Sequence, residues 1–139
     1  MLDVLDRAIA LHQAPLFAAL TPDELLPLAE LCSDVELGQG ERLFGEGEPG
    51  DSLYVIVAGR VGIEQAGRRV AELGVGECVG ELAALDWEPR SATVVALEPT
   101  DLVRLERDDL LDQLGDHPEL LRALAVVLSA RLRHRQRAR

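Results

Sequence analysis

The segment SLYVIVAGRVGIEQAGRRVAEL, Ser52–Leu73, decides the fold class of this 139-residue chain. It opens with an uninterrupted apolar run rich in β-branched residues, and glycines then divide the rest into two further short runs. Short β-rich runs bounded by glycine are typical of strands joined by tight turns. The segment therefore predicts three consecutive strands, with turns near Ala58-Gly59 and Ala66-Gly67.

The same character extends over residues 33–106, where short β-rich pieces alternate with glycine and proline. Further strands are predicted at 34–37 and 42–44, and two more in SATVVAL and TDLVRLE, which Glu98-Pro99-Thr100 separates. Seven or eight short strands at regular spacing favour an antiparallel sandwich or barrel. We therefore predict a mainly β fold with flanking helices: an antiparallel β jelly-roll barrel of about eight strands.

Helical patterns lie on both sides of these strands. Residues 2–12 have helical spacing, and in LTPDEL Thr21 and Glu24 form the signature of a capping box. After Arg107 we expect a short helix that stops near Gly115, and then a long helix. The chain is interpreted as one domain, 1–139, with N-terminal helices in 1–32, the β roll in 33–106 and C-terminal helices in 107–139.

Charge limits the possible ligands and partners. The net charge is −11, yet five of the 14 arginines lie in the last nine residues, which leaves nine arginines against 25 acidic residues in the rest. Such an acidic body repels nucleic acids, so an anionic ligand can bind only where local groups overcome that field. No apolar run reaches the roughly 18–20 residues that span a bilayer, so we expect no membrane segment and a cytoplasmic protein.

The cysteines and histidines argue against an enzyme. Cys32 and Cys78 lie in apolar contexts and are predicted to be buried, reduced thiols. A jelly roll can carry a metal-dependent enzyme, but this chemistry needs clustered histidines and glutamates. Residues 34–106 contain no histidine at all. We therefore expect no enzyme, no metal and no cofactor.

The segment VGELAALDWEPRSATVVA, Val79–Ala96, places a glycine before a short helical piece that Pro89 ends. Free amides at a helix start bind phosphate, and Arg90 can add charge-assisted hydrogen bonds. Glu81 could accept a hydrogen bond from a sugar hydroxyl. These groups suit a nucleotide or a sugar phosphate. Spacing alone leaves open the alternative that Glu81 and Arg90 simply form an ion pair with each other.

This segment resembles the phosphate-binding cassette of the cyclic nucleotide-binding domain family, which includes catabolite-activator-type regulators, cyclic-nucleotide-gated channels and protein kinase regulatory subunits. The matching residues are Gly80-Glu81-Leu82-Ala83 and Pro89-Arg90-Ser91-Ala92-Thr93-Val94, with the cassette spanning 79–94. The segment GERLFGEGEPGDSLYVIVAGRVGI, Gly40–Ile63, is similar to the early strands and glycine turns of the family. The resemblance covers about residues 15–130.

The resemblance implies roles for seven residues. Arg90 would contact the cyclic phosphate, with Ser91 beside it, while Glu81 and the Gly80 amide would hold the ribose 2′-hydroxyl. Ala83 would donate its amide to the phosphate. Val79 would form part of the apolar lining of the site. Arg131 would stack on the base, with Ser129 as the alternative residue for this contact.

These roles describe a sensor that binds cyclic AMP, or less favourably cyclic GMP, and relays binding through its C-terminal helices. The alternative is a non-binding scaffold that keeps the fold and assembles as a homodimer through the long helix. Direct DNA binding is not expected, because a catabolite-activator-type DNA-binding domain would follow the long helix, so the effector domain would lie outside this chain. The predicted apolar face of that helix comprises Leu121, Leu124, Leu128 and Leu132.

Overall fold

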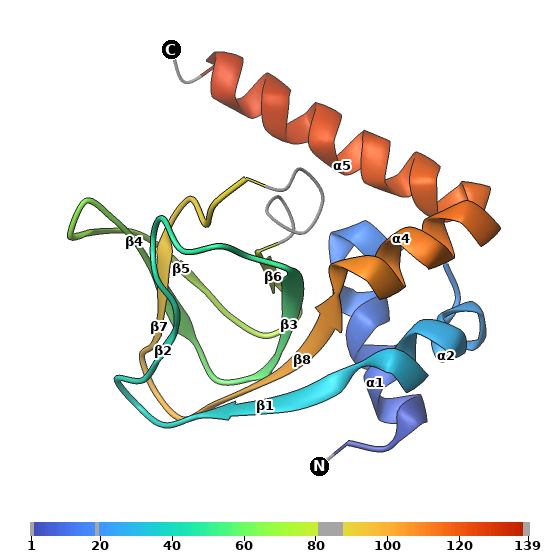
Figure 1. Ribbon diagram of the computed structural model, residues 1–139, viewed down its shortest axis with the longest axis horizontal. Helices are drawn as coiled ribbons and strands as arrows, with labels where there is room; N and C mark the ends of the chain where they lie inside the picture. Colours follow the sequence, from blue (N-terminus) through green and yellow to red (C-terminus); the bar gives the residue numbers. More distant parts are fainter. Residues whose placement is uncertain (1, 19, 81–87, 138–139) are drawn as a thin grey trace.

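The computed structural model describes residues 2–18, 20–80 and 88–137 (Figure 1). Within the last helix, the side chains of 123, 127, 131, 132 and 134–137 are not described. The strands form a roll with most helices on one side of it, and the last helix begins on that side and extends along the top of the view (Figure 1). The chain passes from N-terminal helices through the strands to C-terminal helices.

Eight described strands form two four-stranded antiparallel sheets, which confirms the predicted jelly-roll class as two sheets rather than a closed barrel. The strand β6 was not predicted, because two residues in a glycine-rich stretch carry no detectable period. The first sheet has the order β1 (Ser33–Leu37), β8 (Thr100–Glu106), β3 (Ser52–Ala58), β6 (Cys78–Val79). The second has the order β2 (Arg42–Phe44), β7 (Thr93–Ala96), β4 (Val61–Gln65), β5 (Arg68–Leu73).

Strand β3 is apolar after its first residue, Ser52, because it is buried on both faces. Tyr54 and Ile56 belong to the core that contains residues of both sheets. Leu53 and Val55 belong to the second core, which the first sheet shares with the helices. A strand with two buried faces needs no polar alternation, so its sequence reads as a continuous apolar run.

The hairpin that joins β4 to β5 has a turn made by Ala66 and Gly67, as the sequence predicts. Both residues have positive φ, at 51° and 77°. This pair of angles belongs to a type I′ turn, whose twist matches that of the strands it connects. The turn also contacts the loop after β2, because the Ala66 amide donates to Glu46 Oε1 at 3.0 Å.

The N-terminal helices begin and end close to the predicted residues. The capping box of the second helix is present: Thr21 Oγ1 accepts from the Glu24 amide at 3.2 Å, and Glu24 Oε1 accepts from the Thr21 amide at 3.0 Å. None of the described helices is both long and apolar enough to cross a membrane. The helices are α1 (Val4–Gln13), the 3-10 turn η1 (Pro15–Phe17), α2 (Pro22–Leu31), α4 (Arg107–Asp116) and α5 (Pro118–Arg137).

Two details of the C-terminal helices correct the sequence analysis. Helix α4 passes through Gly115 and ends one residue later, at Asp116. On α5 the predicted leucine face is wrong at Leu121, which is 54% exposed, because the face that packs on the core begins at Leu120. Leu124 and Leu128 follow on this buried face at four-residue spacing. Two of the leucines assigned to a dimer seam are therefore used inside the domain.

The two cysteines are free thiols in different surroundings. Cys32 is buried in the core beneath the helices, and burial raises the pKa of its thiol to about 12. Its Sγ donates to the Leu28 carbonyl at 3.4 Å. The prediction of a buried thiol is confirmed for Cys32, whereas Cys78 on β6 is half-buried.

Helix α1 is tied to β1 by one partly buried ion pair. Arg7 contacts both carboxylate oxygens of Asp34, with distances of 3.1 Å from Nη2 and 3.3 Å from Nε. Its Nη1 donates to the Cys32 carbonyl at 3.1 Å. The hydrogen bonds from Arg7 hold the pKa of Asp34 below its ordinary value.

We expect Asp34→Asn to remove a pH-dependent part of the stability. The pKa of Asp34 is lower in the folded than in the unfolded chain, so its contribution exists above the unfolded value and is lost as the pH falls through the folded one. The wild type should exceed the variant by about 1 kcal/mol at pH 7, with a smaller difference at pH 3. Urea unfolding at both pH values measures this. A difference that does not change with pH would contradict the expectation.

Candidate functional site

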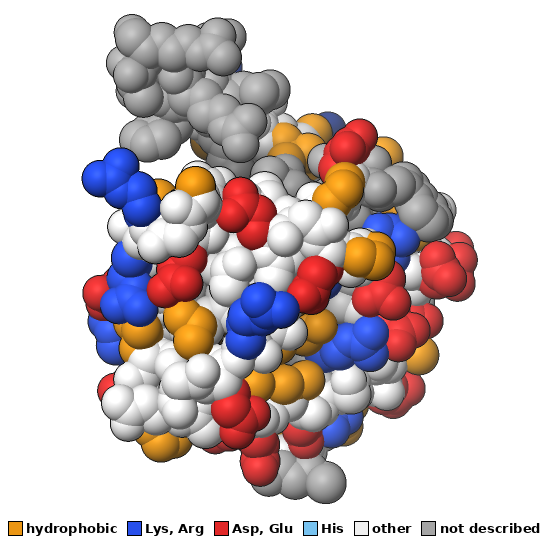
Figure 2. All heavy atoms as spheres, turned by 60° about the vertical axis from the view of Figure 1, so that its left-hand side comes forward, with side chains coloured by type: hydrophobic (Ala, Val, Ile, Leu, Met, Phe, Trp, Pro, Cys, Tyr) orange, Lys and Arg blue, Asp and Glu red, His pale blue; other side chains and the backbone are white. Residues whose placement is uncertain are grey.

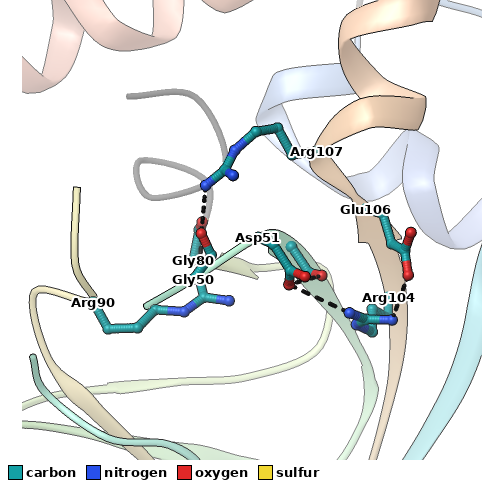
Figure 3. A network of polar contacts seen from close by, with 8 residues as sticks. Gly50, Asp51, Gly80, Arg90, Arg104, Glu106 and Arg107 are labelled. Carbon is teal, nitrogen blue, oxygen red and sulfur yellow. Dashed lines mark hydrogen bonds and ion pairs between the residues drawn. The ribbon is translucent and has the colours of Figure 1, made fainter. Parts of the chain in front are cut away.

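Arg90 lies inside the molecule although it precedes β7 in an irregular segment. Its side chain is one of the few buried charged ones, with 5% of the residue exposed. The backbone is paired with the loop between β2 and β3: the Arg90 amide donates to the Glu48 carbonyl, and the Gly47 amide donates to the Arg90 carbonyl, both at 2.8 Å. These two bonds fix the direction in which the side chain enters the roll (Figure 3).

Two glycines form the slot that receives the guanidinium. A Cβ placed on Gly50 would lie 2.3 Å from Arg90 Nε, and one placed on Gly80 would lie 2.4 Å from Arg90 Nη1. Gly80 also has φ of +82°, a conformation that side chains rarely tolerate. Figure 3 shows Arg90 reaching toward both glycines. The guanidinium thus occupies the space that any larger residue would fill.

The hydrogen bonds of Arg90 are incomplete. Nη1 donates to the Gly80 carbonyl at 3.2 Å, whereas Nε is buried and has no acceptor among the described residues. No described carboxylate forms an ion pair with Arg90. Leaving such a donor unsatisfied costs about 1–3 kcal/mol, or more for a charged group. An anion with an oxygen at this position would remove that cost.

Burial lowers the pKa of Arg90, and the nearby Arg107 and Arg104 guanidinium groups lower it further. An arginine nevertheless stays charged in proteins. The slot is therefore a desolvated positive charge inside an acidic protein of net charge −11. A local cationic centre of this kind can attract an anion that the rest of the molecule repels.

Two aromatic rings lie next to the guanidinium. Arg90 Cζ is 4.0 Å from the centroid of the Phe44 ring on β2 and 5.8 Å from that of Tyr54 on β3. The two ring centroids are 6.0 Å apart. Both distances to Cζ lie within the range of cation–π contacts. The charge is thus held against aromatic faces from two different sheets.

The loop before β3 connects this slot to helix α4. Arg107 is the first residue of α4, is 8% exposed, and donates from Nη2 to the Gly50 carbonyl. Its backbone amide donates to the Asp51 carbonyl at 2.7 Å. Arg104 contacts Asp51 Oδ1 at 3.3 Å and Glu106 Oε1 at 2.9 Å. Figure 3 shows Arg107 and Arg90 approaching Gly50 from opposite sides.

The structure brings together four of the seven predicted site residues. Val79 is buried between the sheets, and Gly80 follows it and contacts Arg90. Ser91 is exposed, and its carbonyl accepts from Gln65 Nε2 at 3.1 Å. The remaining three are not described: Glu81 and Ala83 lie outside the described residues, and Arg131 lies on α5 with its side chain outside them.

Sequence reasoning missed the residues that surround Arg90 from other elements. Gly50 was assigned only to the glycine turns of the segment Gly40–Ile63, yet it forms one wall of the slot. Phe44 was assigned only to a strand, and Arg107 only to a helix start. One available signal is composition, since Phe44 is one of only two phenylalanines in the chain.

Three exposed arginines of the roll differ from Arg90 because each of them has a carboxylate partner. Acidic and basic side chains alternate over the face of the roll that Figure 2 shows. No group of three or more potential metal ligands occurs among the described residues. The paired arginines are Arg42 with Glu48 at 2.9 Å, Arg60 with Glu72 at 2.8 Å, and Arg69 with Glu64 at 3.3 Å.

Comparison with known proteins agrees with this geometry. Residues 34–117 match the family model described as cyclic nucleotide-binding domain. The chain is 33% identical over 131 residues to the CRP-like cAMP-activated global transcriptional regulator of Mycobacterium tuberculosis, covering 88% of this chain and 57% of that protein. The chain thus spans little more than half of that relative's length.

Solved structures resemble the whole described fold. The N-terminal domain of a transcriptional regulator from Streptomyces coelicolor A3(2) is 39% identical with a TM-score of 0.75, and the match covers 98% of this chain and 94% of that one. The Thermus thermophilus catabolite activator protein is 36% identical with a TM-score of 0.80, covering 88% and 60% of the two chains.

Proposed function

Because the chain belongs to the cyclic nucleotide-binding domain family, we propose that it binds a cyclic nucleotide in the Arg90 slot and acts as a regulatory sensor. The observation that carries this proposal is the buried guanidinium, which has neither an acceptor for Nε nor a carboxylate partner among the residues that the structure describes. A cyclic phosphate supplies both the missing acceptor and the missing negative charge. The proposed role is regulatory and not enzymatic.

In this proposal the phosphate binds to Arg90 and to the backbone next to Ser91. Gly80 and Glu81 hold the ribose hydroxyl, and the Ala83 amide adds a donor to the phosphate. Val79 supports the apolar lining from its buried position on β6. Arg131 covers the base from α5, where a planar guanidinium can stack on a purine.

Cyclic AMP is the proposed ligand in preference to cyclic GMP. The Mycobacterium tuberculosis relative is described as cAMP-activated, and the similarity to it covers 88% of this chain. The hydroxyl of Ser91 itself suits either nucleotide, since it can donate or accept. Parallel titration with the two ligands separates them.

The proposed relay runs from the slot to the C-terminal helices through Arg107. The contact between Arg107 and the Gly50 carbonyl joins the first residue of α4 to one wall of the slot. Helices α4 and α5 both pack on the core beneath the first sheet, through Leu110 and Leu120. A ligand that moves Arg90 against Gly50 therefore acts on the attachment of α4. It shifts the helices only as far as its affinity differs between their positions.

Isothermal titration calorimetry of the chain with cyclic AMP tests the proposal. We expect saturable binding with a dissociation constant below 1 mM, and weaker binding of cyclic GMP. Hydrogen exchange with and without ligand tests the relay, and we expect the amide protection of α4 and α5 to change. The absence of heat at millimolar cyclic AMP, with no change in exchange, would refute the sensor function.

The alternative is a scaffold that assembles through α5, and the packing of this helix weighs against it. Leu124 and Leu128 pack on the core of their own domain. The large apolar side chains that α5 exposes among its described residues are Leu121 and Val126, at 54% and 64%. They are five positions apart in the helix, so they lie about 140° apart around the axis and form no continuous seam. A homodimer through α5 thus remains a separate proposal about assembly, and it is compatible with the binding of a cyclic nucleotide.

A further inference from the structure

We propose that Phe44 is a positioning residue for Arg90: its ring, in place of a carboxylate, holds the guanidinium in the slot between Gly50 and Gly80. The proposal rests on the proposed function only in so far as the ligand is a cyclic nucleotide. The contact itself joins two residues of the protein. It links the last residue of β2 to the segment that precedes β7.

The geometry that supports this role is the short distance between ring and charge. Arg90 Cζ lies 4.0 Å from the Phe44 centroid, well inside the roughly 6 Å limit for a cation–π contact. Tyr54 lies beside both groups, with its ring centroid 6.0 Å from that of Phe44 and 5.8 Å from Arg90 Cζ. Phe44 is opposite Val94 in the pairing of β2 with β7, so the ring is carried by the strand next to the Arg90 segment.

A buried cation needs a compensating partner, and the described residues offer Arg90 few of them. Among the described residues, the Gly80 carbonyl is the one acceptor for its guanidinium, and no carboxylate forms an ion pair with it. The aromatic face supplies negative electrostatic potential, and this attraction is strongest for a desolvated cation. The ring therefore offsets part of the cost of burying the charge of Arg90.

An aromatic partner differs from a carboxylate in its effect on binding. A carboxylate accepts hydrogen bonds from arginine and would have to be displaced by a phosphate. A phenyl ring has no acceptor atom, so the N–H donors of Arg90 remain available to phosphate oxygens. Phe44 can thus hold the arginine in place without competing for it. Such preorganisation raises affinity by reducing the cost of ordering the site.

Binding experiments on Phe44 variants test the proposal. We expect Phe44→Leu to weaken cyclic AMP binding about tenfold, which corresponds to about 1.4 kcal/mol, within the range of a desolvated cation–π contact. Phe44→Tyr keeps the aromatic face and should stay within about twofold of the wild type. The matched control is Val35→Ala, since Val35 is a partly buried residue packed on the same core, on β1 at the opposite edge of the first sheet from β6, which leads to Gly80. It should lower stability and leave affinity unchanged.

A double-mutant cycle in the ligand-free protein tests the contact independently of any ligand. Urea midpoints are compared for the wild type, Phe44→Leu, Arg90→Met and the double variant. We expect the double variant to lose less than the sum of the two single losses, because both substitutions remove the same contact.

Each outcome decides one question. Unchanged affinity of Phe44→Leu, equal weakening by Val35→Ala, or additive losses in the cycle would overturn the role of Phe44. If the wild type binds no cyclic nucleotide, the proposed function fails. The cycle then still tests the contact. Coupling between Phe44 and Arg90 would support the role of Phe44 in holding Arg90, in a slot that binds another anion.

Discussion

Replacing Arg90 with methionine is expected to weaken cyclic AMP binding by at least about 100-fold, because two charge-assisted hydrogen bonds of about 1.5–3 kcal/mol each are lost. Methionine fills much of the same slot without charge, so the packing between Gly50 and Gly80 is largely kept. Arg90→Lys retains the charge but not the planar donors, and we expect an intermediate loss of about tenfold. Calorimetric titration to millimolar ligand measures all three proteins.

The control for Arg90→Met is Arg60→Met, which makes the same change of side chain and charge on the roll. Arg60 is about half exposed and pairs with Glu72 at 2.8 Å. An effect of net charge alone would weaken binding equally in both variants, whereas an effect of the slot would appear only at Arg90. Urea unfolding shows whether Arg90→Met remains folded. A folded Arg90→Met that binds with wild-type affinity would place the phosphate elsewhere.

Much of the fold was predictable because its signals are local. The type I′ turn at Ala66-Gly67 and the capping box of Thr21 and Glu24 each depend on residues within a few positions of one another. The continuous apolar run of β3 also carries its meaning locally, since a strand buried on both faces has no polar positions. Signals of this kind survive without any knowledge of tertiary contacts.

The face of α5 was assigned wrongly because its leucines occur at adjacent positions. Leu120 and Leu121 fit a helical stripe equally well with Leu124 and Leu128 downstream. Only the packing of α5 against η1 and the core selects Leu120, which is fully buried, over Leu121. Helical periodicity defines a stripe but not which of two neighbouring residues begins it.

The site residues that lie in one sequence segment were predictable, whereas those that come from other elements of the fold were not. Arg90 and Gly80 belong to one segment whose pattern indicates phosphate binding. Gly50, Phe44 and Arg107 come from three other elements, and only the folded roll brings them to the guanidinium. Their types are unremarkable for a turn, a strand and a helix start. Their function becomes visible only through distances.

Gly50 is the residue whose substitution separates the shape of the slot from its charge. A Cβ at this position would lie 2.3 Å from Nε and 2.6 Å from Cζ of Arg90, so the guanidinium must move away. Gly80 is unsuitable for the same test, because its φ of +82° would add backbone strain to the displacement. No positive φ accompanies Gly50, so alanine there changes mainly the space available to Arg90.

We expect Gly50→Ala to weaken cyclic AMP binding by about 30-fold or more, although every charged side chain remains. Misplacing a positioned group by about 1 Å is sufficient for losses of this order. The displaced guanidinium should also lose its contact with the Gly80 carbonyl and with the Phe44 ring. The cost in stability should be about 1–3 kcal/mol, as for other overpacked sites. Calorimetry and urea unfolding of the same preparation measure the two effects.

The matched control is Gly74→Ala, in the loop after β5. A Cβ on Gly74 would meet one side-chain atom, Arg60 Nη1, at 4.0 Å, and this glycine also lacks a positive φ. It should bind cyclic AMP like the wild type, since the substitution meets open space and lies outside the slot. Wild-type affinity in Gly50→Ala would show that phosphate binding does not require Arg90 to occupy the position between the two glycines. If Gly50→Ala loses affinity and Gly74→Ala does not, the lack of a side chain at Gly50 is as necessary for binding as the charge of Arg90.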